Sequence, residues 1–213
     1  MLPKCLRPWA RCLLLSVVLT ISTAQAAPFP VTIGTSLLAG AQAILAFDFI
    51  EGGPPANTVS ILNFSTDGTL GVASTMGDVS GTLPGQVTLG DTSFFNEYAQ
   101  AIALGNVISF IVDASSNAPD SGSFPDAFSF FLLDPTTWLS LVTTSDPTGA
   151  NALFLYSIGE PNPLTIYDSP EVTVSVPSVP EPPTVLLMVT ALAIATLRFA
   201  PRRQRKVAAA RTS

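Results

Sequence analysis

The charged residues of this chain are separated by sign along the sequence. All nine lysines and arginines lie near the two ends, before residue 12 or after residue 197, whereas the 15 aspartates and glutamates all lie between them. The long middle of the chain therefore has to fold without basic side chains, so ion pairs between side chains cannot hold it together. Each basic end flanks an apolar run, which is the usual arrangement of a segment handled by a membrane machinery.

The N-terminal end has the three parts of a secretory signal peptide. Its basic residues precede the ten-residue apolar run Cys12–Ile21, which is too short to span a bilayer because a spanning helix needs about 20 residues. Ala24 and Ala26 then occupy the small positions of an A-x-A cleavage pattern. We expect signal peptidase to remove residues 1–26, so that the mature chain begins at Ala27 and loses both cysteines of the sequence.

The C-terminal end contains a proline-rich linker over residues 177–183, an apolar stretch over 184–200 and a basic tail over 201–213. A helix of the stretch's first fourteen, uncharged residues spans about 21 Å, which falls short of a hydrocarbon core of about 30 Å. Three more residues make a transmembrane helix long enough, because an arginine side chain can reach the headgroups. We expect the basic residues to stay on the cytoplasmic side and to set orientation and retention. These residues are Arg198, Arg202, Arg203, Arg205 and Lys206.

A short motif stands between the middle of the chain and the apolar stretch. Its residues are Val179, Pro180, Glu181 and Pro182. With the apolar helix and the basic cluster behind it, this motif resembles the PEP-CTERM sorting signal of Gram-negative bacteria. The resemblance implies that an exosortase, an integral-membrane enzyme similar to a cysteine transpeptidase, cuts near the motif and releases or transfers the protein to the outside.

The resemblance extends into the middle of the chain. Four stretches there look like a recurrent group of PEP-CTERM proteins of unknown activity, namely residues 58–70, 77–83, 91–98 and 127–134. Because that group has no established chemistry, the resemblance implies only a fold and a route of sorting. We expect export through the inner membrane and transient anchoring in it. The final place is then the cell surface or the extracellular matrix, in association with exopolysaccharide or a biofilm.

The middle of the chain, residues 27–176, has the pattern of short strands. β-Branched and aromatic residues alternate with polar ones in several runs, and clusters of Gly, Pro, Asn and Asp separate the runs. Alternation places one side of each strand in a core and the other in water. The clearest apolar sets are Leu45, Phe47 and Phe49, then Ile108, Phe110 and Val112, and finally Val172, Val174 and Val176. Roughly ten such strands predict an all-β domain, a β-sandwich of jelly-roll-like topology.

Two kinds of segment depart from simple alternation. Residues 128–133 and 152–156 are apolar at nearly every position, which favours central strands of a closed double layer. Residues 93–104 are the one segment of the domain that a helix would also fit. We therefore keep a helix there as an alternative to a further strand.

The composition of the middle of the chain excludes several functions. Between Ala27 and Pro180 there is no His, Cys, Lys or Arg, so Ser-His-Asp and Cys-His catalytic systems and His/Cys zinc sites cannot form there. Nucleic acid is excluded as a partner because nothing basic neutralises phosphates. Paired carboxylates can hydrolyse a glycosidic bond, but no pair stands out in the sequence. We expect a non-enzymatic protein without catalytic residues or cofactor, and a carboxylate glycosidase is a hypothesis of a different class.

A calcium site is the alternative to a protein without metal. Four oxygen-bearing side chains fall in one segment, and calcium prefers oxygen ligands. They are Asp113, Asn117, Asp120 and Asp126. Their spacing matches neither an EF-hand nor a repeat-type calcium loop, so we expect no bound metal and interpret the segment as a flexible acidic loop.

The aromatic residues suggest a sugar-binding role. Trp138 follows a predicted turn, which favours an exposed indole that stacks on a pyranose ring. Phe94, Phe95 and Tyr98 form a second aromatic group in the sequence, although phenylalanines are usually core residues. The expected function is therefore that of a non-enzymatic surface or matrix protein. The alternative is a carbohydrate-binding sandwich module, with calcium assisting if the acidic loop binds it.

Overall fold

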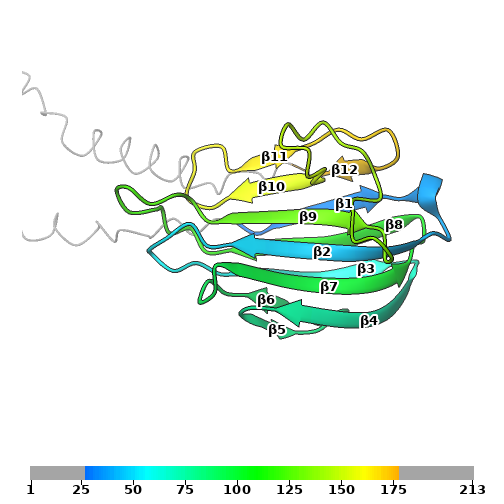
Figure 1. Cartoon of the computed structure of the whole chain (residues 1–213), viewed down its shortest axis with the longest axis horizontal. Coiled ribbons are helices and arrows are strands. Elements are labelled where there is room, and N and C mark those ends of the chain that lie inside the picture. The colour runs from blue at the N-terminus through cyan, green and yellow to red at the C-terminus, as the bar shows by residue number, and fades with distance from the viewer. Residues whose placement is uncertain (1–26, 178–213) are drawn as a thin grey trace, which may run out of the picture. The chain divides into compact units, whose positions relative to one another are not determined.

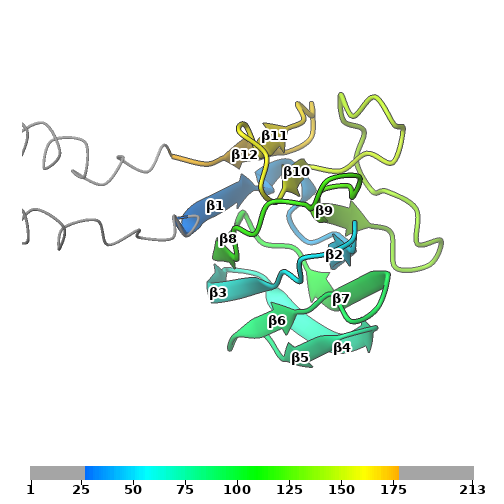
Figure 2. The same cartoon turned by 90° about the vertical axis from the view of Figure 1, so that its left-hand side faces the viewer.

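The computed structural model describes residues 27–177, in which twelve strands form two six-stranded antiparallel sheets packed face to face (Figure 1). The elements are β1 (Phe29–Gly34), η1, a 3-10 turn (Ser36–Leu38), β2 (Gln42–Ile50), β3 (Val59–Thr66), β4 (Thr69–Met76), β5 (Val79–Gly81), β6 (Val87–Leu89), β7 (Phe95–Ala103), β8 (Val107–Ala114), β9 (Ala127–Leu133), β10 (Phe154–Ser157), β11 (Leu164–Ile166) and β12 (Thr173–Ser175). The first sheet has the order β12-β1-β8-β3-β6-β5, and the second has the order β11-β10-β9-β2-β7-β4. Figure 2 shows the two layers from one end. The predicted all-β, sandwich-like fold is confirmed for these residues.

The predicted targeting segments lie outside the described residues. They are the signal peptide over residues 1–26, the linker beyond Pro177, the apolar stretch over 184–200 and the basic tail over 201–213. Among residues 27–177, no helix is long and apolar enough to cross a membrane. Signal cleavage, anchoring and sorting therefore stay predictions.

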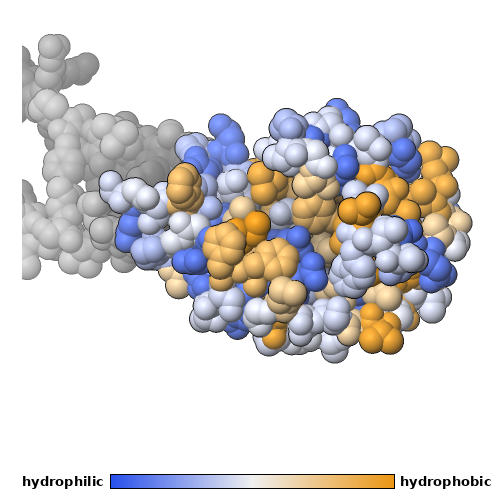
Figure 3. Space-filling view, in the orientation of Figure 1, coloured by the Kyte–Doolittle hydropathy of each residue, from blue (hydrophilic) through white to orange (hydrophobic). Residues whose placement is uncertain are grey.

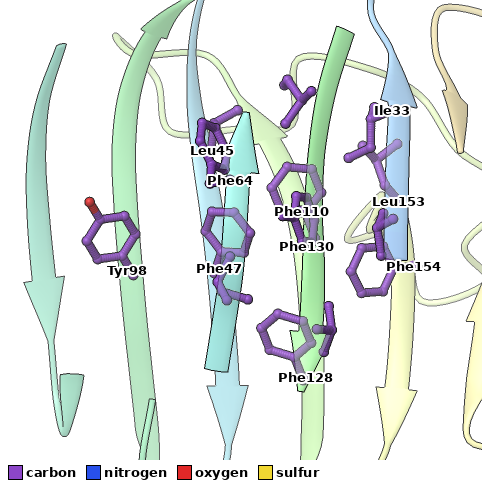
Figure 4. Close-up of a cluster of buried hydrophobic side chains, with 14 of the residues drawn as sticks. Ile33, Leu45, Phe47, Phe64, Tyr98, Phe110, Phe128, Phe130, Leu153 and Phe154 are labelled. Carbon is purple, nitrogen blue, oxygen red and sulfur yellow. The ribbon is translucent and has the colours of Figure 1, made fainter. Parts of the chain in front are cut away.

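The core is built by the inward-facing residues that the alternation predicts. Leu45, Phe47 and Phe49 of β2 are fully buried. Phe110 of β8 meets Phe47 edge-on across the two layers, with ring centroids 5.3 Å apart (Figure 4). Burying a side chain of this size stabilises a fold by roughly 1.5–3 kcal/mol. Aromatic packing of this kind holds the two sheets together without a disulfide.

The segment over residues 93–104 is a strand, and the helical alternative is wrong. β7 pairs with β2 along its whole length and with β4 on its other side. Its inward side includes the buried amide of Gln100, which accepts a hydrogen bond from the Tyr98 hydroxyl and donates one to the Gly71 carbonyl, each at 2.9 Å. Such buried amides interrupt the apolar side of the alternation, which is why the sequence pattern does not separate strand from helix here.

Residues 134–151, here called the covering loop, form most of the connection between β9 and β10. Most of the covering loop lies on the outer side of the second sheet, although Val142 reaches the core. The loop passes in front of one end of β2 in Figure 1 and lies beyond β9 and β2 in Figure 2. Two aspartates, each followed by a proline, fix its shape. The Asp134 carboxylate accepts a hydrogen bond from the Thr137 N–H at 2.8 Å, and the Asp146 carboxylate accepts one from the Thr148 N–H at 2.9 Å.

Candidate functional site

A cavity of about 600 Å³ lies between the covering loop and the outer face of the second sheet. Ligand sites in proteins are usually concave and of roughly 300–1,000 Å³, so this cavity has the size of a small-ligand site. In Figure 3, which views this side of the molecule, apolar residues gather among polar ones. The lining residues are Asp48, Glu97, Phe131 and Leu133 from the sheet, and Trp138, Leu139, Ser140, Gly149, Ala150 and Asn151 from the loop.

Small residues on the outer face of the sheet let the covering loop approach it closely. Ala46 of β2 and Ala99 of β7 are buried, although neither belongs to the hydrophobic core between the sheets. Ser129 of β9 stands on the same face, opposite Asp48 of β2. The outer face of a sandwich is usually in contact with water. This face differs, because the covering loop shields part of it from water.

Two carboxyl groups meet on the sheet side of the cavity. Asp48 of β2 and Glu97 of β7 are direct cross-strand partners, and such partners have Cβ atoms about 4.5–5.5 Å apart. Burial, repulsion by Glu97 and a hydrogen bond with Glu97 raise the pKa of Asp48 to about 7. Burial also raises the pKa of Glu97, and the hydrogen bond from Asp48 opposes that rise. In slightly acidic solution Asp48 is therefore mostly protonated.

One oxygen of this pair has no partner. Oδ1 of Asp48 is buried and makes no hydrogen bond to any of the described residues. A buried acceptor without a partner is unfavourable, and such atoms are few in native proteins. Asp48 lines the cavity with another part of its surface, so a ligand donor would reach Oδ1 only after the side chain turns toward the cavity.

Trp138 stands at the rim of the cavity, with 48% of its surface exposed. Its backbone φ is 59° and that of Asn151, which also lines the cavity, is 60°. Asparagine adopts positive φ readily, but a bulky residue such as Trp138 is strained there, and such strain often gathers at functional sites. The Trp138 N–H donates a hydrogen bond to the Asp134 carbonyl at 2.9 Å, which fixes this conformation. The indole also lines a second hollow of about 150 Å³, formed with β4 and β7.

The predicted exposure of Trp138 is confirmed, but the second aromatic group is divided. Phe94 is 71% exposed, Phe95 is half-buried, and Tyr98 is buried in the core. The Tyr98 hydroxyl accepts a hydrogen bond from the Leu83 N–H at 2.9 Å. These three residues therefore do not form one exposed platform for a sugar.

The four candidate calcium ligands are distributed over a strand and a loop. Asp113 is the next-to-last residue of β8, and Asp120, Asn117 and Asp126 lie between β8 and β9. Within residues 27–177, no group of three or more His, Cys, Asp or Glu side chains is arranged to hold a metal ion.

Two of these four residues make hydrogen bonds that hold the segment in place. The buried carboxylate of Asp126 accepts hydrogen bonds from the Gly52 N–H at 2.6 Å and from Nδ2 of Asn57 at 2.8 Å. Nδ2 of Asn117 donates to the Ala56 carbonyl at 2.8 Å. Asp126 and Asn117 therefore tie the segment to the chain that follows β2.

The Asp48–Glu97 pair is the feature that sequence reasoning missed. The available signal was a lone acid inside the apolar run Ile44–Ile50. The sequence does not give the register that sets Glu97 opposite Asp48, because that register depends on pairing between distant segments. The alternation does predict that Asp48 points away from the core, which is confirmed.

Among the predicted processing residues, only Ala27 lies in the described part of the chain, where it is exposed. The others, Ala24, Ala26 and the residues of the sorting motif and basic cluster, lie outside it. No protein-family model matches the chain, and neither a curated protein nor a solved structure matches it significantly.

Proposed function

We propose that this chain is an exported, non-enzymatic protein of the cell surface or extracellular matrix, and that it binds carbohydrate in the cavity beside Trp138. The observation that carries the binding role is a half-exposed indole, held at positive φ, at the rim of a cavity with two carboxyl groups. An aromatic ring supplies a flat apolar surface for a sugar face. Carboxyl oxygens accept hydrogen bonds from sugar hydroxyls.

The route to the cell surface is proposed from the termini of the sequence. Residues 1–26 supply the export signal, and Val179-Pro180-Glu181-Pro182 supplies the motif similar to PEP-CTERM signals. An exosortase then cuts near this motif and separates the domain from its membrane segment. Association with exopolysaccharide in a biofilm agrees with a sugar-binding cavity. We also propose a jelly-roll-like topology, because β1 to β4 and again β6 to β9 alternate between the two sheets.

The geometry of the carboxyl pair supports binding rather than glycoside hydrolysis. In glycosidases the two catalytic carboxyl groups flank the scissile bond, about 5–5.5 Å apart in retaining enzymes and farther apart in inverting ones. Asp48 and Glu97 are direct partners on neighbouring strands, so their side chains project side by side from one face of the sheet. Two carboxyl groups on the same wall of the cavity do not lie on opposite sides of a bound glycosidic linkage.

The test is the binding of extracellular polysaccharide by the purified full chain in affinity electrophoresis. Trp138→Ala should weaken binding at least tenfold, about 1.4 kcal/mol. Phe124→Ala is the matched control, because Phe124 is 77% exposed and does not line the cavity. Equal binding by Trp138→Ala and Phe124→Ala would show that the cavity does not bind the polysaccharide. Shortening of the polysaccharide during incubation would contradict the non-enzymatic assignment.

A further inference from the structure

We infer that the cavity beside Trp138 recognises a sugar with a free, protonated amine in preference to neutral, N-acetylated or acidic sugars. This inference rests on the proposed carbohydrate function and adds the chemical class of the ligand. It follows from what the cavity lining offers to a ligand and from the charge of the domain around it.

Two of the polar side chains that the covering loop contributes to the cavity, those of Ser140 and Asn151, already bond within the loop, and the indole N–H of Trp138 is the loop's other side-chain donor there. Oγ of Ser140 donates a hydrogen bond to the Val142 carbonyl at 2.8 Å. Oδ1 of Asn151 accepts one from the Thr144 N–H at 3.1 Å, and its Nδ2 donates one to the Gly149 carbonyl at 3.3 Å. The loop lining therefore offers a ligand few unused polar groups.

The sheet side offers acceptors. Oδ1 of Asp48 is buried without a partner among the described residues, and Glu97 adds a second carboxyl group beside it. A carboxylate only accepts hydrogen bonds, whereas an ammonium group carries three donors and no acceptor. Hydrogen bonds between an ammonium group and carboxylates are about twice as strong as those between neutral groups. An amine on the ligand matches this side of the cavity better than a hydroxyl or an acetyl group does.

The charge of the domain favours the same ligand class. Every acidic residue of the chain except Glu181 lies within residues 27–177, and these residues include no Lys, Arg or His. A domain with only negative charges repels uronic acids and sulfated sugars and attracts cations. General attraction does not choose a site, but the carboxyl pair inside the cavity places two of these charges beside Trp138.

Binding of an amine is coupled to release of a proton from the pair. The groups that face Asp48 are Glu97 from β7 and Ser129 from β9, and none of the residues that the covering loop contributes to the cavity titrates. Because the pKa of Asp48 is about 7, this carboxyl group is mostly protonated at pH 6, where the amine of an amino sugar is mostly an ammonium ion already. A nearby ammonium ion stabilises the ionised form of a carboxyl group, so at pH 6 the proton of Asp48 should pass to the buffer when the amine binds.

The experiment is isothermal titration calorimetry of the full chain with two probes of equal length, a glucosamine oligosaccharide and its fully N-acetylated counterpart. Titrations at pH 6, where the amine is mostly charged before it binds, in two buffers with different ionisation enthalpies give the number of protons released. We expect at least tenfold tighter binding of the amine form, with a net release of protons. Equal affinity for the two probes, or binding of the amine without proton release, would overturn the inference.

Two variants separate a specific site from general attraction. Glu97→Gln should abolish the preference for the amine, whereas Glu160→Gln, which removes the same charge from an exposed residue outside the cavity, should preserve it. An equal loss in both variants would mean nonspecific attraction and would overturn the inference. Asp48→Asn gives a second test of the pair, and melting temperatures show whether each variant is folded.

Trp138→Ala separates this inference from the proposed function. If Trp138→Ala abolishes binding of both probes while Glu97→Gln changes neither, the carbohydrate function holds and the amine preference fails. If Trp138→Ala leaves the binding of both probes unchanged, the cavity is not the carbohydrate site and both proposals fail.

Discussion

The outer faces of the two sheets differ, although the strands of both show the same alternation. On the first sheet, Thr32 of β1 is exposed, and the hydroxyl groups of Ser60 and Thr88 bond to each other at 2.9 Å on a polar face. On the second sheet, Ala46 and Ala99 are buried outside the core. The difference is due to the covering loop, which lies over the second sheet. Whether the outer face of a sheet is exposed to water or forms a cavity therefore depends on whether a loop between strands covers it.

The largest difference between the two outer faces is expected when the same large charged residue is placed on each of them. Ala46→Arg puts a long charged side chain into a closed space, where desolvation costs several kcal/mol and overpacking adds about 1–3 kcal/mol, and the Asp48 carboxyl on the same face offsets only part of this cost. We expect a loss of roughly 5 kcal/mol or more, enough to unfold many domains. Thr32→Arg on the first sheet should change the free energy of unfolding by less than about 0.5 kcal/mol. Urea unfolding of both variants measures the difference, and similar losses would mean that the two faces are equally accessible.

The second prediction concerns the buried carboxyl on the covered face. Because the pKa of Asp48 is about 7 in the folded protein and 3.8 ordinarily, the folded state binds more protons than the unfolded state between these values. Stability therefore falls as the pH rises from about 4 to 7, by at most about 4 kcal/mol. Asp48→Asn removes this loss, so the variant should be more stable than the wild type at pH 8 and no more stable at pH 4.

Urea unfolding at the two pH values tests this prediction. Glu160→Gln is the control, because it removes a carboxylate from an exposed position. A gain in stability for Asp48→Asn that is the same at pH 4 and pH 8 would contradict a raised pKa. It would point instead to better packing of the amide.

The sequence predicts the core better than it predicts the site. Phe47 and Phe110 follow from period-two alternation, which is a local property, and both are buried. Trp138 was found because a turn precedes it and an indole there has no core to enter. The pairing of Asp48 with Glu97 was not predictable, because strand register between distant segments is a property of the whole sandwich. The covering loop could be placed over one face only once the sheet order was known.

The third prediction tests the turn that shapes the covering loop. Burial alone would raise the pKa of Asp146, but hydrogen bonds from Thr148 and from the Ala152 N–H lower it below its usual value. A carboxyl group with a lowered pKa stabilises the fold above its unfolded pKa, and this stability is lost as the pH falls through the folded pKa. Asp146→Ala should therefore cost about 1–3 kcal/mol at pH 7 and less at pH 3, opposite in sign to Asp48→Asn. Chemical denaturation at the two pH values measures both, and an equal cost at pH 3 and pH 7 would assign the loss to packing.

The smallest expected effect on stability belongs to Trp138, which faces the cavity from the same loop. Trp138→Gly removes a half-exposed side chain and relieves strain of about 1–3 kcal/mol at a positive φ, so stability should change by no more than about 1 kcal/mol. Val142→Ala is the matched variant on the core side of the loop, because Val142 is buried in the core. Its loss of two methyl groups should cost about 2 kcal/mol, since each buried carbon contributes about 0.8 kcal/mol and the space left adds to the loss. The effects on carbohydrate binding should have the reverse order, with binding lost in Trp138→Gly and kept in Val142→Ala. If Trp138→Gly were instead the more destabilised variant, the indole would be a support of the covering loop, and its exposure would need no ligand to explain it.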